Sequence, residues 1–337
     1  MNLRVAVDAS NLARDRRGMG RHVRGVVYRL FDLGIEPLLV VSSRDAAEEL
    51  RAERPGIEVA TLDDARRRAF DAAWYPWNGM RFQVRAPALV TVHDLFAFDA
   101  AHRSPIARWR EQRPIARAMR HAAQIATVSA YSAARVAARF GRDATVVPPV
   151  LEPMWQPVPA QRLERAVLFV AGPEPRKNAR FLIHCMREAF PANDVMLVVA
   201  GTLGSEDARA LESSGILHDR IAPNDEALRE WYARVAVVAV PSLAEGFGLG
   251  ALEAMACGAA VIASNATALP EACDGAALLA PPDDALAWSG ALRMAIDDER
   301  TRADLQRRSL ARAARVDRDA AARVTAELLR RCAESAR

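Results

Sequence analysis

Short apolar runs alternate along this chain with longer stretches of helical periodicity. This alternation is typical of βαβ units built around a parallel sheet. Helical stretches are predicted over 21–33, 105–121 and 130–140. Strands are predicted over 3–8, 37–42, 57–60, 73–75, 89–93, 125–129 and 145–147 in the first half, and over 167–171, 196–200, 215–221, 235–241, 260–264 and 276–279 in the second. The pattern therefore predicts an α/β protein with two doubly wound, Rossmann-like domains.

A proline-rich segment separates the two halves. Five prolines fall between Pro148 and Pro159, where each removes a backbone donor and biases the preceding residue toward extended conformations. We expect an N-terminal domain over 1–155, a C-terminal domain over 156–310, and a terminal helical segment over 311–337 that packs back on the first domain. Because open doubly wound sheets bind ligands at the carboxyl ends of their strands, the active site is expected in a cleft between the domains.

Composition narrows the functional classes. The 337 residues carry a net charge of +4, with 51% hydrophobic residues and a single lysine. No apolar run reaches the ~20 residues of a membrane span, and no signal-peptide pattern opens the chain, so we expect a cytoplasmic protein with the option of peripheral contact at the inner membrane face. The four cysteines lie far apart and are expected to be buried thiols. No Asp-x-Asp motif ends a strand, so no metal cofactor is expected.

The segment from Val240 to Gly258 is the most informative for chemistry. A strand is followed by a glycine-rich turn and then by a helix that is predicted to end at Gly258. Backbone N–H groups in such a turn, together with the helix N-terminus, suit a phosphate. Glu245 and Glu253 flank the turn and could reach a sugar ring and a ribose diol. The alternative is a plain strand–turn–helix in which Glu245 is a cap and Glu253 lies on a solvated face.

Two further positions follow strands. Lys177 and Arg176 come after the first strand of the second half, where an ammonium and a guanidinium could both contact phosphate oxygens. His93 ends a strand of the first half and precedes Asp94. A lone histidine in that place is more often a structural residue than a functional one. The glycine-rich turn that ends at Arg21 does not match a dinucleotide-binding fingerprint.

Taken together, these segments resemble the retaining family-4 glycosyltransferases, which have the GT-B fold. The resemblance covers nearly the whole chain in the family's order, and the variant is most similar to mannosyltransferase-like members that act on lipopolysaccharide, exopolysaccharide or capsule precursors. It is carried by the stretch EGFGLGALEAMACG over 245–258, and by the segments 264–271, 171–178, 92–95, 127–132 and 17–21.

The resemblance implies roles for these residues. Glu253 is expected on the ribose hydroxyls of a nucleotide and Glu245 on the donor sugar, while Lys177 and Arg176 face the diphosphate. His93 and Asp94 are expected on the acceptor side, where His93 would orient sugar hydroxyls and is not assigned as a general base. The other donor contacts implied are the backbone of Phe247, Gly248 and Leu249, the loop carrying Gly18, Gly20 and Arg21, and backbone groups near Ile221 that read the base.

The expected activity is retaining transfer of a hexose, mannose by resemblance and so from GDP-mannose, to a glycan or lipid-linked glycan. The resemblance favours a front-face displacement in which the leaving phosphate accepts the proton. Two alternatives stay open: a sugar-nucleotide epimerase of similar fold, and a non-catalytic nucleotide-sugar-binding protein. Nucleic acid is not an expected partner. The four arginines at 110, 113, 117 and 120 share one face of a predicted helix, which is either solvated or in contact with anionic lipid.

Overall fold

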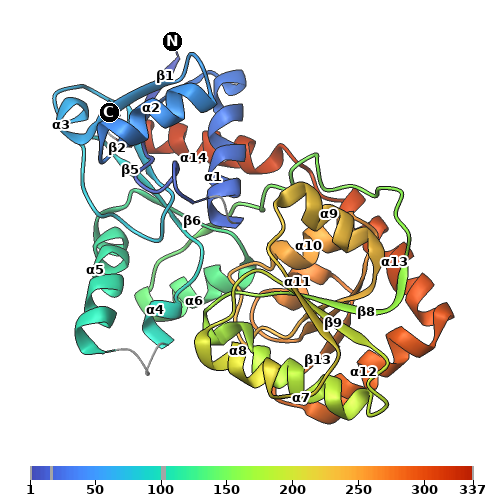
Figure 1. The fold of residues 1–337 in the computed structure, drawn as a ribbon. Helices are drawn as coiled ribbons and strands as arrows, with labels where there is room; N and C mark the ends of the chain where they lie inside the picture. The colour runs from blue at the N-terminus through green and yellow to red at the C-terminus, as the bar shows by residue number, and fades with distance from the viewer. Residues whose placement is uncertain (1, 16–17, 100–103, 336–337) are drawn as a thin grey trace. The chain divides into compact units, whose positions relative to one another are not determined.

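The computed structural model describes residues 2–15, 18–99 and 104–335. The chain forms two compact units, one over 1–152 together with 317–337, and the other over 153–316 (Figure 1). The predicted boundary at 155 lies three residues from the one in the structure, and the second crossing comes at 316 instead of 310.

Unit 1 is a seven-stranded parallel sheet in the order β3-β2-β1-β4-β5-β6-β7. Each strand predicted for this half has a counterpart, and the expected α/β class is confirmed. The strands are β1 (Leu3–Asp8), β2 (Ile35–Val41), β3 (Glu58–Thr61), β4 (Ala72–Tyr75), β5 (Ala88–Val92), β6 (Gln124–Thr127) and β7 (Thr145–Val146). The helices are α1 (Gly18–Leu30), η1 (Phe31–Leu33), α2 (Arg44–Glu53), α3 (Leu62–Ala65), α4 (Phe96–Asp99), α5 (Pro105–His121), α6 (Ala130–Phe140) and α14 (Ala320–Glu334).

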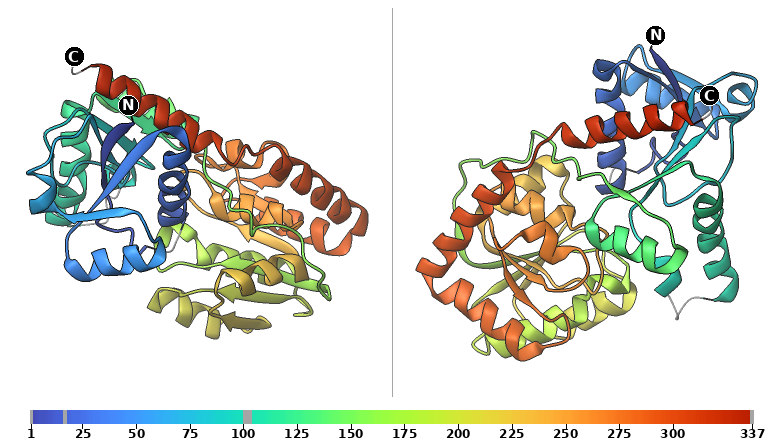
Figure 2. Two further views of the ribbon diagram at one scale, coloured as in Figure 1. Left: turned by 90° about the horizontal axis from the view of Figure 1, so that it is seen from above. Right: turned by 180° about the vertical axis from the view of Figure 1, so that it is seen from behind.

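Helices cover both faces of this sheet, which explains why its central strands are almost wholly apolar. On one face Val26 of α1 and Leu329 of α14 pack into the same cluster as Val5 and Leu39. Helix α14 lies along unit 1 after the chain has passed through unit 2 (Figure 2). On the other face α5 packs against β5 and α6 packs against β6, within a second apolar cluster. Polar residues stand at the carboxyl ends of two strands, because Asp8 ends β1 and His93 directly follows β5.

Unit 2 is a six-stranded parallel sheet in the order β10-β9-β8-β11-β12-β13. Helices α7 and α12 pack on each other and share one apolar cluster with its strands. The strands are β8 (Leu163–Val170), β9 (Met196–Ala200), β10 (His218–Ile221), β11 (Val235–Val240), β12 (Ala260–Ser264) and β13 (Leu278–Ala280). The helices are η2 (Pro175–Lys177), α7 (Ala179–Ala189), α8 (Ser205–Glu212), α9 (Asp225–Arg234), α10 (Leu249–Ala256), α11 (Leu269–Cys273), α12 (Ala285–Asp297) and α13 (Glu299–Ala314).

All four cysteines are free and buried, as the sequence predicts. Burial raises the pKa of each thiol to about 12, so none is a reactive thiolate at neutral pH. Within the described ranges, no helix is both long and apolar enough to cross a bilayer.

Candidate active site

Strands β8 and β11 are hydrogen-bonded neighbours at the centre of the unit 2 sheet. Their carboxyl ends therefore open side by side, and the loops that follow them carry the residues that the sequence singled out. Arg176 and Lys177 lie in η2 after β8, whereas Glu245 lies in the loop after β11. The parallel pairing brings residues 68 positions apart into contact.

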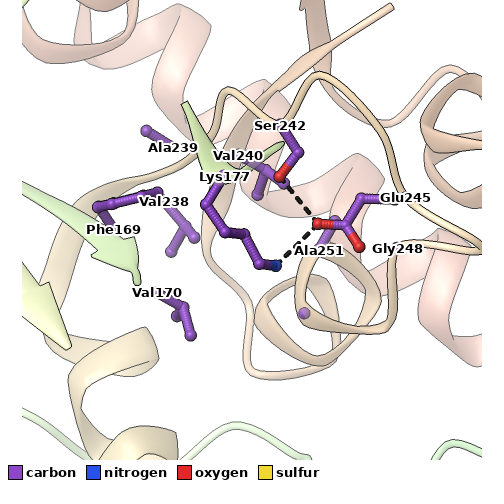
Figure 3. A pocket seen from close by; sticks show the side chains of 11 residues that line it. Phe169, Val170, Lys177, Val238, Ala239, Val240, Ser242, Glu245, Gly248 and Ala251 are labelled. Carbon is purple, nitrogen blue, oxygen red and sulfur yellow. Dashed lines mark hydrogen bonds and ion pairs between the residues drawn. The ribbon is translucent and has the colours of Figure 1, made fainter. Parts of the chain in front are cut away.

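Glu245 holds both cations. Its Oε1 accepts a hydrogen bond from Lys177 Nζ at 2.8 Å (Figure 3). Its Oε2 lies 3.1 Å from Arg176 Nη1. The Ser242 hydroxyl also donates to Oε1, at 2.8 Å. Burial raises the pKa of Glu245, but the charges of Lys177 and Arg176 outweigh burial and hold that pKa below its ordinary value. The carboxyl is thus a carboxylate at neutral pH, with two cations that remain partly exposed.

Backbone contacts fix the two loops to each other. Leu243 N donates to Arg176 O at 2.8 Å. The Asn178 side-chain amide donates to Pro241 O at 3.1 Å and to Pro282 O at 2.8 Å. Asn178 has a φ of +62°, in the left-handed region that asparagine tolerates better than most residues. Arg176 and Lys177 therefore sit on a short, anchored turn, so their positions are set before any ligand arrives.

The glycine-rich turn leads into α10. Gly248 has a φ of +108°, and a Cβ there would lie 2.8 Å from the Leu269 side chain, so the position requires glycine. Glu245 N donates to Thr267 Oγ1 at 2.9 Å, which ties the turn to the loop after β12. A cavity of about 60 Å³ opens here, lined by Lys177, Glu245 and Gly248 among others (Figure 3).

Of the other predicted donor-site residues of unit 2, two flank Gly248 and two lie elsewhere in the unit. Phe247 and Leu249 flank Gly248 and are half-buried. Glu253 lies on α10, is 2% exposed, and does not line the cavity. Ile221 ends β10 at the sheet edge, where its carbonyl accepts a hydrogen bond from Gly201 N at 2.8 Å.

Unit 1 places His93 directly after β5. Its Nε2 lies 2.8 Å from Pro76 O, and its backbone N–H donates to Asn78 Oδ1 at 2.5 Å. Because a carbonyl oxygen only accepts, Nε2 carries the hydrogen and Nδ1 is left as an acceptor. Burial lowers the pKa of His93, so the ring is neutral at physiological pH. Asp94 is half-buried, and its carboxylate accepts from Phe96 N at 3.1 Å.

The predicted loop residues Gly18, Gly20 and Arg21 form the first turn of α1. A Cβ on Gly20 would overlap Asp15 O, so the close approach of this backbone to the helix requires glycine. Arg21 is half-buried. Arg17, the first residue of the same motif, lies outside the described residues.

Sequence reasoning missed two buried titratable groups of unit 1. His22 is 2% exposed and meets the His93 ring edge-on, with 5.6 Å between the ring centroids, and burial lowers its pKa to about 3. Asp8, at the end of β1, is 1% exposed, and burial raises its pKa. Asp8 stands at the end of a strand, which is a signal by which it could have been found. His22 lies within an apolar stripe of a helix, and no sequence signal marks it. In unit 2, Ser242 and Thr267 were likewise missed.

Comparison with known proteins decides the family. The family model described as glycosyl transferases group 1 matches residues 164–298. The O-antigen chain mannosyltransferase B of Escherichia coli is 30% identical over 295 residues, which cover 78% of this chain and 77% of that protein. This chain belongs to the group 1 glycosyltransferases. The relationship identifies it as a transferase, and nothing found supports the epimerase alternative.

More distant proteins agree with this family. The MMP alpha-(1->4)-mannosyltransferase of Mycolicibacterium hassiacum is 30% identical to this glycosyltransferase over 205 residues, which cover 55% of this chain and 50% of that one. Among solved structures, Anabaena Alr3699/HepE in complex with UDP-glucose superposes with a TM-score of 0.77 at 18% identity, covering 97% of this chain and 99% of that one. This likeness shows that the glycosyltransferase has the expected GT-B fold.

Proposed function

We propose that this glycosyltransferase moves a mannosyl residue from GDP-mannose to a glycan or lipid-linked glycan in polysaccharide biosynthesis, with retention at the anomeric carbon. The observation that carries the donor site is the cluster of Lys177, Arg176 and Glu245 at the carboxyl ends of β8 and β11. Two relatives that are named mannosyltransferases support the sugar. A neighbour of the same fold that was solved with UDP-glucose supports a nucleotide sugar as the donor class.

The two cations account for leaving-group stabilisation. A nucleoside diphosphate departs with negative charge on its β-phosphate, and preorganised cations that face this charge lower the barrier. Lys177 supplies a point charge and Arg176 a planar fork, so the pair matches adjacent phosphate oxygens. The charge that a metal ion would otherwise supply comes from these side chains, so we propose that transfer needs no divalent metal.

Glu245 divides its role between the cations and the sugar. In the absence of donor, its carboxylate compensates Lys177 and Arg176. When a diphosphate arrives, the cations gain phosphate oxygens as partners, and the carboxylate becomes available to sugar hydroxyls. Glu253 is proposed to act on the ribose from α10. The backbone from Phe247 to Leu249 is proposed to hold the sugar and diphosphate.

The bond changes follow a front-face displacement. The bond between the anomeric carbon and the β-phosphate oxygen breaks, and an acceptor hydroxyl oxygen forms the new bond on the same face. The hydroxyl proton passes to the departing phosphate oxygen, so no protein base is needed. In unit 1 we assign to the neutral His93 a hydrogen bond from a sugar hydroxyl to its Nδ1. Asp94, Gly20 and Arg21 are proposed as further substrate contacts of this unit.

Donor turnover tests the proposal. The enzyme is incubated with GDP-mannose, and in parallel with UDP-glucose, together with candidate polysaccharide and lipid-linked acceptors. Release of the nucleoside diphosphate and the anomeric proton signals of the product are then followed. Mannose transfer with an α-anomeric product supports the proposal. Glucose transfer from UDP-glucose alone would correct the donor, and an inverted product would overturn the mechanism.

A further inference from the structure

Helix α5 is fixed to unit 1 by one face. Ile115, Ala118 and Met119 are buried against the sheet. The loop after β4 also grips the helix, because Met80 N donates to Pro114 O at 3.1 Å and a Cβ on Gly79 would lie 2.5 Å from the Pro114 backbone. These contacts fix the orientation of α5 about its own axis and therefore determine which of its side chains face outward.

The outward face combines large apolar side chains with arginines. Ile106 is 73% exposed and Trp109 is 57% exposed. Arg110, Arg113 and Arg120 are exposed, while Arg117 is half-buried and donates to Gln83 Oε1 at 2.7 Å. At 3.6 residues per turn these side chains fall within about 60° of the direction of Ile106. We call this set, Ile106, Trp109, Arg110, Arg113, Arg117 and Arg120, the α5 basic face.

Charge on this helix is segregated. Its one acidic residue, Glu111, projects about 140° away from Ile106 by the same helical geometry. On α13, by contrast, Arg307 and Arg308 pair with Asp304 of the same helix. The guanidinium of Arg113 lies 5.0 Å from the centre of the Trp109 ring, so the aromatic and the cation form one surface.

We propose that the α5 basic face docks on the surface of a membrane that contains anionic lipids. Arginines along an acid-free stripe meet lipid phosphates, while a tryptophan and an isoleucine at one end enter the boundary between head groups and acyl chains. A polyanion such as nucleic acid would pair with the arginines but leave Ile106 exposed to water. An anionic bilayer pairs with the arginines and also buries the apolar side chains. The inference goes beyond donor chemistry and gives the enzyme access to acceptors held in a membrane.

Vesicle sedimentation tests this directly. The full-length enzyme without donor is spun with vesicles of phosphatidylcholine alone, or of phosphatidylcholine mixed with phosphatidylglycerol. We expect binding only to the anionic vesicles, and weaker binding at high salt. Each arginine near such a surface is worth about fivefold in the binding constant, so the double variant Arg110→Gln/Arg113→Gln should bind roughly 25-fold more weakly. Trp109→Ala should also weaken binding while leaving the charge unchanged.

A matched control separates this face from net charge. Arg187 is exposed on α7 and Arg300 is exposed on α13, so Arg187→Gln/Arg300→Gln removes the same charge elsewhere. The proposal predicts unchanged sedimentation for this control. It is overturned if wild-type enzyme does not bind anionic vesicles, if both double variants lose binding equally, or if neutral vesicles bind as well. Titration with GDP, carried out separately, reports on the donor site, so failure of either proposal is distinguishable.

Discussion

Replacing Glu245 by glutamine isolates the negative charge that lies between two cations. The amide keeps an acceptor for Lys177 and Ser242 but removes the charge that faces Lys177 at 2.8 Å and Arg176 at 3.1 Å. A hydrogen bond to a charged group contributes about 1.5–3 kcal/mol. Because both cations are partly exposed, solvent screens the pair, and we expect a loss of about 2 kcal/mol in the free energy of unfolding without ligand.

Differential scanning calorimetry measures this loss. For a unit of this size, about 2 kcal/mol corresponds to a fall in Tm of roughly 4–8 °C. The control is Glu230→Gln on the exposed side of α9, which removes the same charge and should leave Tm unchanged. An unchanged Tm for Glu245→Gln would refute the claim that the carboxylate compensates the cations.

Ligand binding by the same variant separates the two roles of Glu245. With the negative charge of residue 245 gone, a diphosphate no longer competes with a carboxylate for Lys177 and Arg176, so GDP should bind at least as tightly as to wild type. GDP-mannose should lose affinity relative to GDP, because its sugar hydroxyls lose an acceptor. Parallel calorimetric titrations measure both constants. Equal weakening of the two ligands would contradict a contact between Glu245 and the sugar.

The pH dependence of this stability has a defined sign. The pKa of Glu245 is lowered in the folded protein from an ordinary value of 4.5. The Glu245 carboxylate therefore makes its full contribution to the free energy of unfolding above about pH 4.5. This contribution is lost as the pH falls through the lower pKa of the folded state. The difference in Tm between wild type and Glu245→Gln should shrink below pH 4.5. A difference that grows in acid would contradict the assignment.

Further substitutions test other parts of the structure. Lys177→Met should weaken GDP binding by about 10–100-fold in calorimetry, from the loss of one charge-assisted contact, and a chelator such as EDTA should leave transfer rates unchanged. Gly20→Ala should cost about 2 kcal/mol or more in urea unfolding, because its Cβ would overlap Asp15 O, whereas Gly290→Ala on α12 meets open space and should be neutral or stabilising. Asp8→Asn should raise Tm at pH 7, where a buried carboxylate is costly, and the gain should vanish below about pH 3.8, because a raised acid pKa favours the native state only in acid.

Much of the fold follows from local patterns. Apolar runs of strand length between helical stretches predict parallel sheets, and the structure has two. The order of the strands does not follow from such patterns, because the local sequence of 235–240 does not determine that this strand pairs with 163–170. The short helices α3 and α4 escaped prediction, since each is four residues long and has too few positions to show a helical period.

The sequence singled out Lys177, Arg176 and Glu245 one by one, but it did not predict the contacts among them. Glycines, a lone lysine and two glutamates after strands predicted a phosphate-binding loop, and this role stays a prediction. The bridge from Glu245 to both cations depends on β8 and β11 being neighbours, a tertiary fact. His22 was missed because its position on α1 follows the same spacing as the buried Val23 and Val26. A buried histidine beside His93 becomes visible only when α1 packs near the end of β5.

Calorimetric titration of the wild-type enzyme with GDP, UDP, ADP and dTDP tests the central claim most directly, when repeated with Lys177→Ala and Glu253→Ala. The account predicts micromolar binding of GDP in preference to the other three nucleotides, weakened by both substitutions. Absence of binding to every nucleotide by folded protein, or binding that neither substitution changes, would contradict the donor site at the ends of β8 and β11.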